Sequence, residues 1–208
     1  MITQRTVAGF LDELASSAPT PGGGSAAAVL GATGAALVSM VCNVTLGKKG
    51  QEAVASEMQA VRDLSEQLRM RLTAMVAADI AAFDGLMAAY RLPKTSEAEK
   101  ATRAEAIQAN LRAATETPLE CARACAEVIA LSRRAGQSGY SGVISDAGVA
   151  AVSANAALRS AALNVYINVP ALKDRAFASQ ATAEIEQLLL DGARDSDSVF
   201  ALVRNRLE

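Results

Sequence analysis

The sequence PTPGGGSAAAVLGATGAALVSMVCNVTLGKK, residues 19–49, contains three consecutive glycines and then a stretch, 25–46, without a charged side chain. Its many alanines favour a helix, because alanine has the highest helix propensity. A helix that is apolar on all sides lies inside a bundle, at a subunit interface or in a membrane. Since this stretch is only weakly hydrophobic and lacks flanking aromatic residues, we expect a buried helix rather than a membrane span.

The composition indicates a core made of helices. Hydrophobic residues make up 51% of the 208 residues, but only 3% are aromatic and Trp is absent. A core of Ala, Leu, Val and Met favours close-packed helices, whereas strands prefer β-branched and aromatic residues. Helical spacing recurs along the chain, and strand-like alternation does not persist. We expect one domain over 1–208, an all-α bundle of about six or seven helices around a long buried central helix.

Local signals predict where the helices begin and end. Ser96 followed by Glu99 is a capping box, and Pro118 starts a helix or kinks a long one. Pro93 and Pro170 interrupt the helical pattern. The expected helices are 6–17, one from about 25, 52–90, one from about 96, one from about 118, one from Ser145 or Asp146 to Asn168 after a loop at 136–142, and one from 174 to the C-terminus.

Charge and residue types exclude several kinds of site. The net charge of −2 does not indicate a nucleic-acid partner, since such proteins usually carry a basic surface. Three cysteines without CxxC spacing argue against a disulfide framework or a zinc site. Histidine is absent, so proton transfer falls to Asp, Glu, Lys, Tyr or water. The N-terminal segment contains acidic residues and does not resemble a signal peptide, which predicts a cytoplasmic protein.

The glycine segment is a candidate ligand loop. Gly22, Gly23 and Gly24 carry no side chains, so a ligand can approach the amide groups where the helix begins near Ser25. The helix dipole favours an anion at that position. The alternative is a flexible turn that lets two helices pack closely.

Asp79 interrupts an apolar stripe of the expected helix 52–90. The stripe steps by three and four residues and consists of Leu68, Leu72, Met75, Phe83, Leu86 and Tyr90. Asp79 occupies the position between Met75 and Phe83, so its carboxylate faces the core. A buried carboxylate either meets a cation or has its pKa raised, as suits a general acid or base. The alternative is a structural ion pair with an arginine from another helix.

A second polar line follows the expected helix that ends at Asn168. Asp146, Ser153, Ser160, Asn164 and Asn168 share one of its faces. Asp146, at the head of the line, is either an ordinary helix cap or a functional carboxylate, and the other side chains either bind a ligand or join packed helices by hydrogen bonds.

Further polar groups lie near the end of the uncharged helix. Ser39 and Asn43 are one turn apart, and Lys48 and Lys49 follow the helix. Lysines there commonly interact with the helix dipole in water. With a carboxylate-bearing ligand, they become candidates for binding its acidic tail.

Several motifs, in this order along nearly the whole chain, resemble the cyclodeaminase/cyclohydrolase family. They are PTPGGGSAAA and GAALVSMVCNVTLGKK within 19–49, DxxAF at 79–83, MAAYRLPK at 87–94, ISDAGVAA from 144 and ALRSAALNVYIN ending at 168. The family includes the cyclodeaminase domain of formiminotransferase-cyclodeaminase and stand-alone methenyltetrahydrofolate cyclohydrolases, and the likeness is greatest to the latter. Gly50 and Gln51 depart from the bulkier or charged residues found there in relatives.

The resemblance implies an all-helical homodimer that binds a folate in a cleft near the subunit interface and needs no metal or other cofactor. The implied reaction is hydrolysis of 5,10-methenyltetrahydrofolate to 10-formyltetrahydrofolate. Asp79 is the expected base, and Asp146 is the second expected carboxylate. Substrate contacts are expected from Pro21, Gly22, Gly23, Gly24, Ser25, Asn43, Lys48, Lys94 and Asn164.

Two other functions fit the same sequence. One is cyclodeamination, in which 5-formiminotetrahydrofolate closes and expels ammonia at the same carbon. The other is a non-catalytic helical module for assembly or membrane association, which the uncharged Ala/Gly-rich helix at 25–46 favours.

Overall fold

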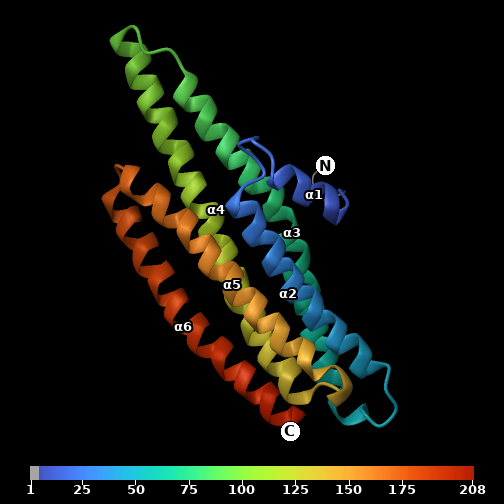
Figure 1. Cartoon of the computed structure of the whole chain (residues 1–208). Helices are drawn as coiled ribbons and strands as arrows, with labels where there is room; N and C mark the ends of the chain where they lie inside the picture. The colour runs from blue at the N-terminus through green and yellow to red at the C-terminus, as the bar shows by residue number, and fades with distance from the viewer. Residues whose placement is uncertain (1–4) are drawn as a thin grey trace.

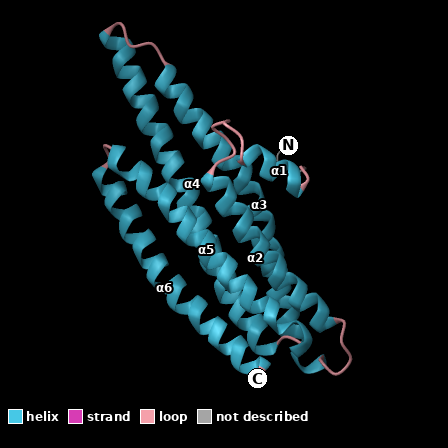
Figure 2. Cartoon of the chain, viewed as in Figure 1, coloured by secondary structure: helices cyan, strands magenta, loops and turns pink. Residues whose placement is uncertain are grey.

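The computed structural model describes residues 5–208, in which six α-helices and three short 3-10 segments occur and strands are absent (Figure 1, Figure 2). The segments are α1 (Val7–Leu14), α2 (Gly23–Leu46), η2 (Glu52–Val54), α3 (Ala55–Arg91), α4 (Glu97–Ser138), η3 (Ser141–Val143), α5 (Ile144–Asn168), η4 (Val169–Ala171) and α6 (Arg175–Leu207). The predicted all-α bundle is confirmed. Of the domain expected over 1–208, residues 1–4 lie outside the described part.

The helix α2 is the central helix of the bundle and packs against α3, α4 and α5 (Figure 1). Its glycines allow this close approach. A β-carbon at Gly31 would lie 2.8 Å from Cys125 Sγ on α4, and one at Gly34 would lie 2.9 Å from the Ala150 carbonyl oxygen on α5. The prediction of a long buried central helix is therefore confirmed.

Two helical segments, Gly23–Leu46 and Glu52–Arg91, are long and apolar enough to cross a membrane, judged by length and composition alone. The most apolar window is 56% buried within the bundle in the first segment and 22% buried in the second. The core helix of a soluble protein meets the same criteria, so this finding is weak support for a membrane span. Packing against three helices accounts for the composition of α2.

The long helix α4 runs through Pro118 without a break, so the helices expected from about 96 and 118 are one helix. Proline has no backbone N–H, which leaves the Ala114 carbonyl without its helical donor. Asn168 on α5 supplies the missing donor, because its Nδ2 lies 2.9 Å from the Ala114 oxygen. A side chain from a distant segment thus makes the internal proline tolerable.

Apart from the start expected at about 118, most predicted helix starts agree with the structure, and one more is wrong. Ser96 and Glu99 form the expected capping box, and Asp174 caps α6 by accepting a hydrogen bond from the Phe177 amide. The expected loop at 136–142 is shorter, since α4 continues to Ser138. Neither Ser145 nor Asp146 caps α5, which begins at Ile144, so Asp146 lies inside its first turn.

Candidate active site

Asp79 lies on the face of α3 that meets the start of α2. Its Oδ2 accepts a hydrogen bond of 2.8 Å from the hydroxyl of Ser25. Ser25 is fully buried and Asp79 is half-buried. Among residues 5–208, no Lys or Arg forms an ion pair with Asp79, in contrast to the structural ion pair considered from the sequence. The carboxylate therefore faces the core with a hydroxyl, and not a cation, as its partner.

The surroundings of Asp79 shift its protonation. Burial raises the pKa of this carboxyl above its ordinary value, because the charged form loses water. The hydroxyl and the backbone N–H of Ser25 oppose this and lower the pKa, but burial is the larger effect. A carboxyl with a raised pKa is a stronger proton acceptor when ionised than an ordinary aspartate, as suits a general acid or base.

Asp79 also explains the bare backbone of the glycine segment. The helix α2 has Gly22 at its N-cap position and no side-chain cap of its own. A β-carbon at Gly24 would lie 2.0 Å from Asp79 Oδ1, so any side chain there would displace the carboxylate. The sequence predicted an anion at this helix start, and the structure places a carboxylate of the protein itself there.

Side chains from four helices surround Asp79. They line a cavity of about 10 Å³, close to the minimum that holds one water molecule. The lining residues are Gly24, Ala28, Met75, Asp79, Thr117, Pro118, Cys121 and Ala161. Residue spacing did not predict that Thr117, Pro118 and Cys121 line the site, although a proline within a helical pattern was a signal that this part of α4 is unusual.

Two other expected contact residues lie at the same end of α2. A β-carbon at Gly23 would lie 3.8 Å from Asn164 Nδ2, so the exposed glycine borders this half-buried amide of α5. Pro21, just before the helix, is buried. The structure thus brings Pro21, Gly22, Gly23, Gly24, Ser25, Asp79 and Asn164 together.

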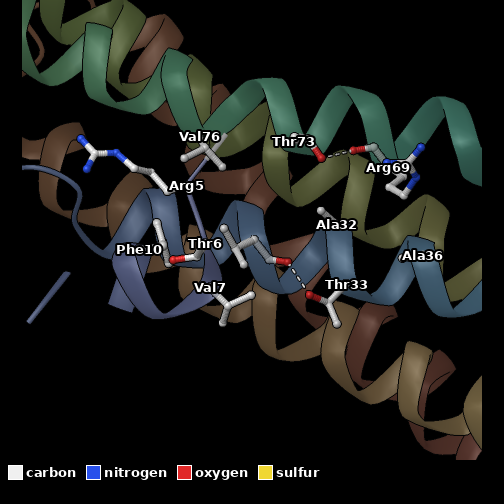
Figure 3. A pocket seen from close by; sticks show the side chains of 11 residues that line it. Arg5, Thr6, Val7, Phe10, Ala32, Thr33, Ala36, Arg69, Thr73 and Val76 are labelled. Carbon is white, nitrogen blue, oxygen red and sulfur yellow. Dashed lines mark hydrogen bonds between the residues drawn. The ribbon is translucent and has the colours of Figure 1, made fainter. Parts of the chain in front are cut away.

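A separate, larger hollow of about 310 Å³ lies along the seam between α2 and α3 beneath α1 (Figure 3). Val29 and Val76 line it, one helical turn beyond Ser25 and Asp79 respectively. Phe10 of α1 contributes an aromatic wall. The two arginines that line the hollow are paired with acidic residues, Arg5 with Glu13 and Arg69 with Glu66, at 2.6 Å each.

Four of the expected site residues lie elsewhere in the chain. Lys48 follows α2, and its Nζ lies 5.0 Å from the centre of the Tyr140 ring. It is 24 positions from Gly24, which corresponds to about 36 Å at the rise of an α-helix. Asn43 is exposed at that same end. Asp146 precedes Ala161, next to Asp79, by 15 positions, or about 22 Å along α5. Lys94 lies in the exposed connection between α3 and α4, which the view in Figure 1 places at the tip of the bundle.

The cysteines are free and buried, as small core residues would be. Burial raises the pKa of Cys42 to about 11, which disfavours the reactive thiolate. Within residues 5–208, no group of three or more Cys, Asp or Glu side chains is arranged to hold a metal ion.

The fold and the site together define an all-helical bundle with a half-buried carboxyl of raised pKa at the start of its central helix. Residues 6–187 match the formiminotransferase-cyclodeaminase family, and the chain belongs to this family. The family resemblance inferred from the motifs is thus confirmed.

Individual relatives cover the whole chain. It is 52% identical over 207 residues to a methenyltetrahydrofolate cyclohydrolase from Methylorubrum extorquens, with 100% of both chains covered. It is 34% identical to formimidoyltransferase-cyclodeaminase from Sus scrofa, covering 96% of this chain and 36% of that protein. The crystal structure of formiminotetrahydrofolate cyclodeaminase from Thermotoga maritima superposes with a TM-score of 0.88 at 27% identity, with 100% of both chains covered.

Proposed function

We propose that the protein hydrolyses 5,10-methenyltetrahydrofolate to 10-formyltetrahydrofolate. The full-length relative with 52% identity carries the name of this activity. The observation in the site that supports the chemistry is Asp79, a half-buried carboxyl with a raised pKa and no cationic partner among residues 5–208.

The substrate's one-carbon unit is an amidinium-like cation between N5 and N10, so an ionised Asp79 favours its binding. Asp79 takes a proton from water as the water oxygen forms a bond to this carbon. The resulting adduct breaks its bond to N5, and Asp79 returns the proton to that nitrogen. The adduct's hydroxyl proton leaves to solvent as the formyl C=O forms, so one water is consumed and one proton is released.

The surroundings of Asp79 support a place for the rest of the substrate. Gly23, Gly24 and Asn164 border the carboxylate, and the hollow beneath α1 begins one turn away. Its apolar wall suits an aromatic ring system, as small-molecule sites are mostly apolar with a few polar groups. We assign the glycine segment and Asn164 to the reacting end of the substrate. Asn43, Lys48, Lys94 and Asp146 stay more distant candidates.

The test is loss of methenyltetrahydrofolate absorbance on addition of purified protein in EDTA, with the spontaneous rate subtracted. We expect turnover to survive chelation, as the predicted absence of a metal or cofactor requires, and to fall about 10²- to 10⁴-fold in a folded Asp79→Asn variant. Full activity in that variant would refute Asp79 as the base. Loss of activity in EDTA that returns with added metal would refute the metal-free reaction.

Formiminotetrahydrofolate cyclodeamination is the second candidate, because the Thermotoga maritima structure with TM-score 0.88 bears that name. This activity is tested with 5-formiminotetrahydrofolate as substrate. The absorbance of methenyltetrahydrofolate then rises as it forms, and the released ammonia is measured in parallel. Ammonia release faster than methenyltetrahydrofolate hydrolysis would favour this activity. Indifference to both folates would favour a non-catalytic module.

We further propose that the protein is a cytoplasmic homodimer, joined through the outer face of α5. Apolar side chains on that face are 37% to 77% exposed, namely Val149, Val152, Leu163, Tyr166 and Ile167. Such a stripe suits burial against a second copy. We expect Leu163→Glu to give a monomer in sedimentation velocity. Leu190→Glu on α6 is the control, since both leucines are 69% exposed; a monomeric wild type would contradict the proposal.

A further inference from the structure

The contact between Ser25 and Asp79 joins the two parts of the molecule that the proposed function uses, the start of α2 and the carboxylate of α3. It spans 54 positions of sequence, and it is a direct hydrogen bond of 2.8 Å between side chains. Ser25 is fully buried, so its hydroxyl is not placed to bind a ligand from solvent. This differs from the substrate contact expected from the sequence.

The two carboxylate oxygens have different surroundings. Oδ2 accepts the Ser25 hydroxyl, whereas Oδ1 lies against the Cα of Gly24, where a β-carbon would be only 2.0 Å away. The hydroxyl on one side and the bare glycine on the other together fix the rotation of the carboxylate. A base that must reach a particular proton depends on such a fixed orientation.

We propose that Ser25 is a positioning residue, whose hydroxyl holds Asp79 by Oδ2 and leaves Oδ1 as the oxygen that exchanges the proton. The inference rests on the proposed function for its catalytic meaning. Its structural part, the orientation and charge state of Asp79, is open to measurement without turnover.

The charged groups around Asp79 leave Ser25 as its main polar partner. Cys121 of α4 is the other titratable side chain that lines the cavity. On α4, Arg123 forms ion pairs with Glu116 and Glu120, and α2 carries no charged side chain. The charged residues nearest in sequence on α5 and α3, Arg159 and Asp84, are exposed. Removing the Ser25 hydroxyl therefore removes a hydrogen bond that favours the ionised carboxylate.

The experiment compares Ser25→Ala with Ser39→Ala. Ser39 is a matched control, because it is a buried serine of the same helix whose hydroxyl lies 2.7 Å from Ser65 Oγ, away from Asp79. We expect Ser25→Ala to lower kcat about 10- to 100-fold at neutral pH. The acidic limb of its kcat profile moves to higher pH, because Asp79 stays protonated over a wider range. Ser39→Ala leaves both unchanged.

A second readout uses ¹³C NMR titration of the aspartate carboxyls, with the Asp79 signal assigned from its loss in Asp79→Asn. We expect its midpoint to rise in Ser25→Ala and to stay unchanged in Ser39→Ala. An unchanged midpoint in a folded Ser25→Ala variant, or equal shifts in the two variants, would overturn the proposal. If the wild type does not hydrolyse methenyltetrahydrofolate, the proposed function fails, and the NMR titration still decides the role of Ser25.

Discussion

The two ends of α2 hold their polar groups in different ways. At its start, Asp79 is half-buried, hydrogen-bonded to Ser25 and pressed against Gly24. Past its other end, Lys48 is exposed and lies over the ring of Tyr140. Both ends carry motifs that resemble the family, but the carboxyl whose pKa is raised by burial lies at the start of α2. The comparison teaches that two motifs of the same family can stand in different surroundings, and burial and orientation are why we propose the chemistry at the start of α2.

The largest expected effect tests the start of α2. We expect Gly24→Ala to lower kcat about 100-fold, because its β-carbon would lie 2.0 Å from Asp79 Oδ1 and push the carboxylate away. Gly23→Ala is the comparison. Its β-carbon would meet nothing closer than Asn164 at 3.8 Å, so we expect any change to fall on KM, through the assigned substrate contact, and not on kcat. Steady-state kinetics of the two variants decide the matter. Equal losses would show that the glycines serve the loop and not Asp79.

The next effect concerns stability and compares two asparagines of α5. Asn168→Ala leaves the Ala114 carbonyl without a donor, so we expect a loss of about 1–3 kcal/mol in urea unfolding. Asn164→Ala loses a bond of 2.9 Å to the Ser160 carbonyl of its own helix, so its loss should be smaller. For activity we expect the opposite order, in which Asn164→Ala has a higher KM than Asn168→Ala because Asn164 is assigned to the substrate. A more stable Asn168→Ala than Asn164→Ala would contradict the account of Pro118.

Sequence periodicity was sufficient to predict which way Asp79 faces, because its neighbours in the stripe belong to the same helix. It was not sufficient to predict the partner, since Ser25 is 54 positions away. The sequence left open whether Pro118 starts a helix or lies within a long one, because the answer depends on Asn168, also 54 positions away from Ala114. Within one copy of the chain, Lys48 and Asp146 lie far from Asp79 because α2 and α5 are long. Lys48 is many helical turns from the start of α2, and Asp146 is many turns from the part of α5 beside Asp79.

A smaller effect is expected from the charge of Asp79 itself. Its pKa is raised in the folded protein, so the folded state loses stability as pH rises from the ordinary aspartate value through the raised one. The loss is complete once the pH lies above the raised pKa, and it is absent in acid, where the carboxyl is protonated in both states. We therefore expect Asp79→Asn to melt at a higher temperature than the wild type at pH 7 but not below the ordinary aspartate pKa. The opposite outcome is that Asp79→Asn melts at a lower temperature than the wild type at pH 7 and that this deficit disappears in acid. It would mean that the ionised carboxylate stabilises the fold as a cap for α2.

The smallest effects are expected at the other end of α2. We expect Lys48→Ala and Asp146→Asn to keep kcat/KM within about threefold of wild type, since Asp146 lies about 22 Å along α5 from the level of Asp79. Lys48→Ala should cost about 0.5–1 kcal/mol in unfolding, from its contact with Tyr140. A loss in Asp146→Asn as large as that in Asp79→Asn would break the comparison between the two ends. Asp79→Asn would then be mixed with Asp146→Asn. Regained activity would show that a second copy supplies Asp146 to the site, because each mixed dimer retains one site with an intact Asp79 and an intact Asp146.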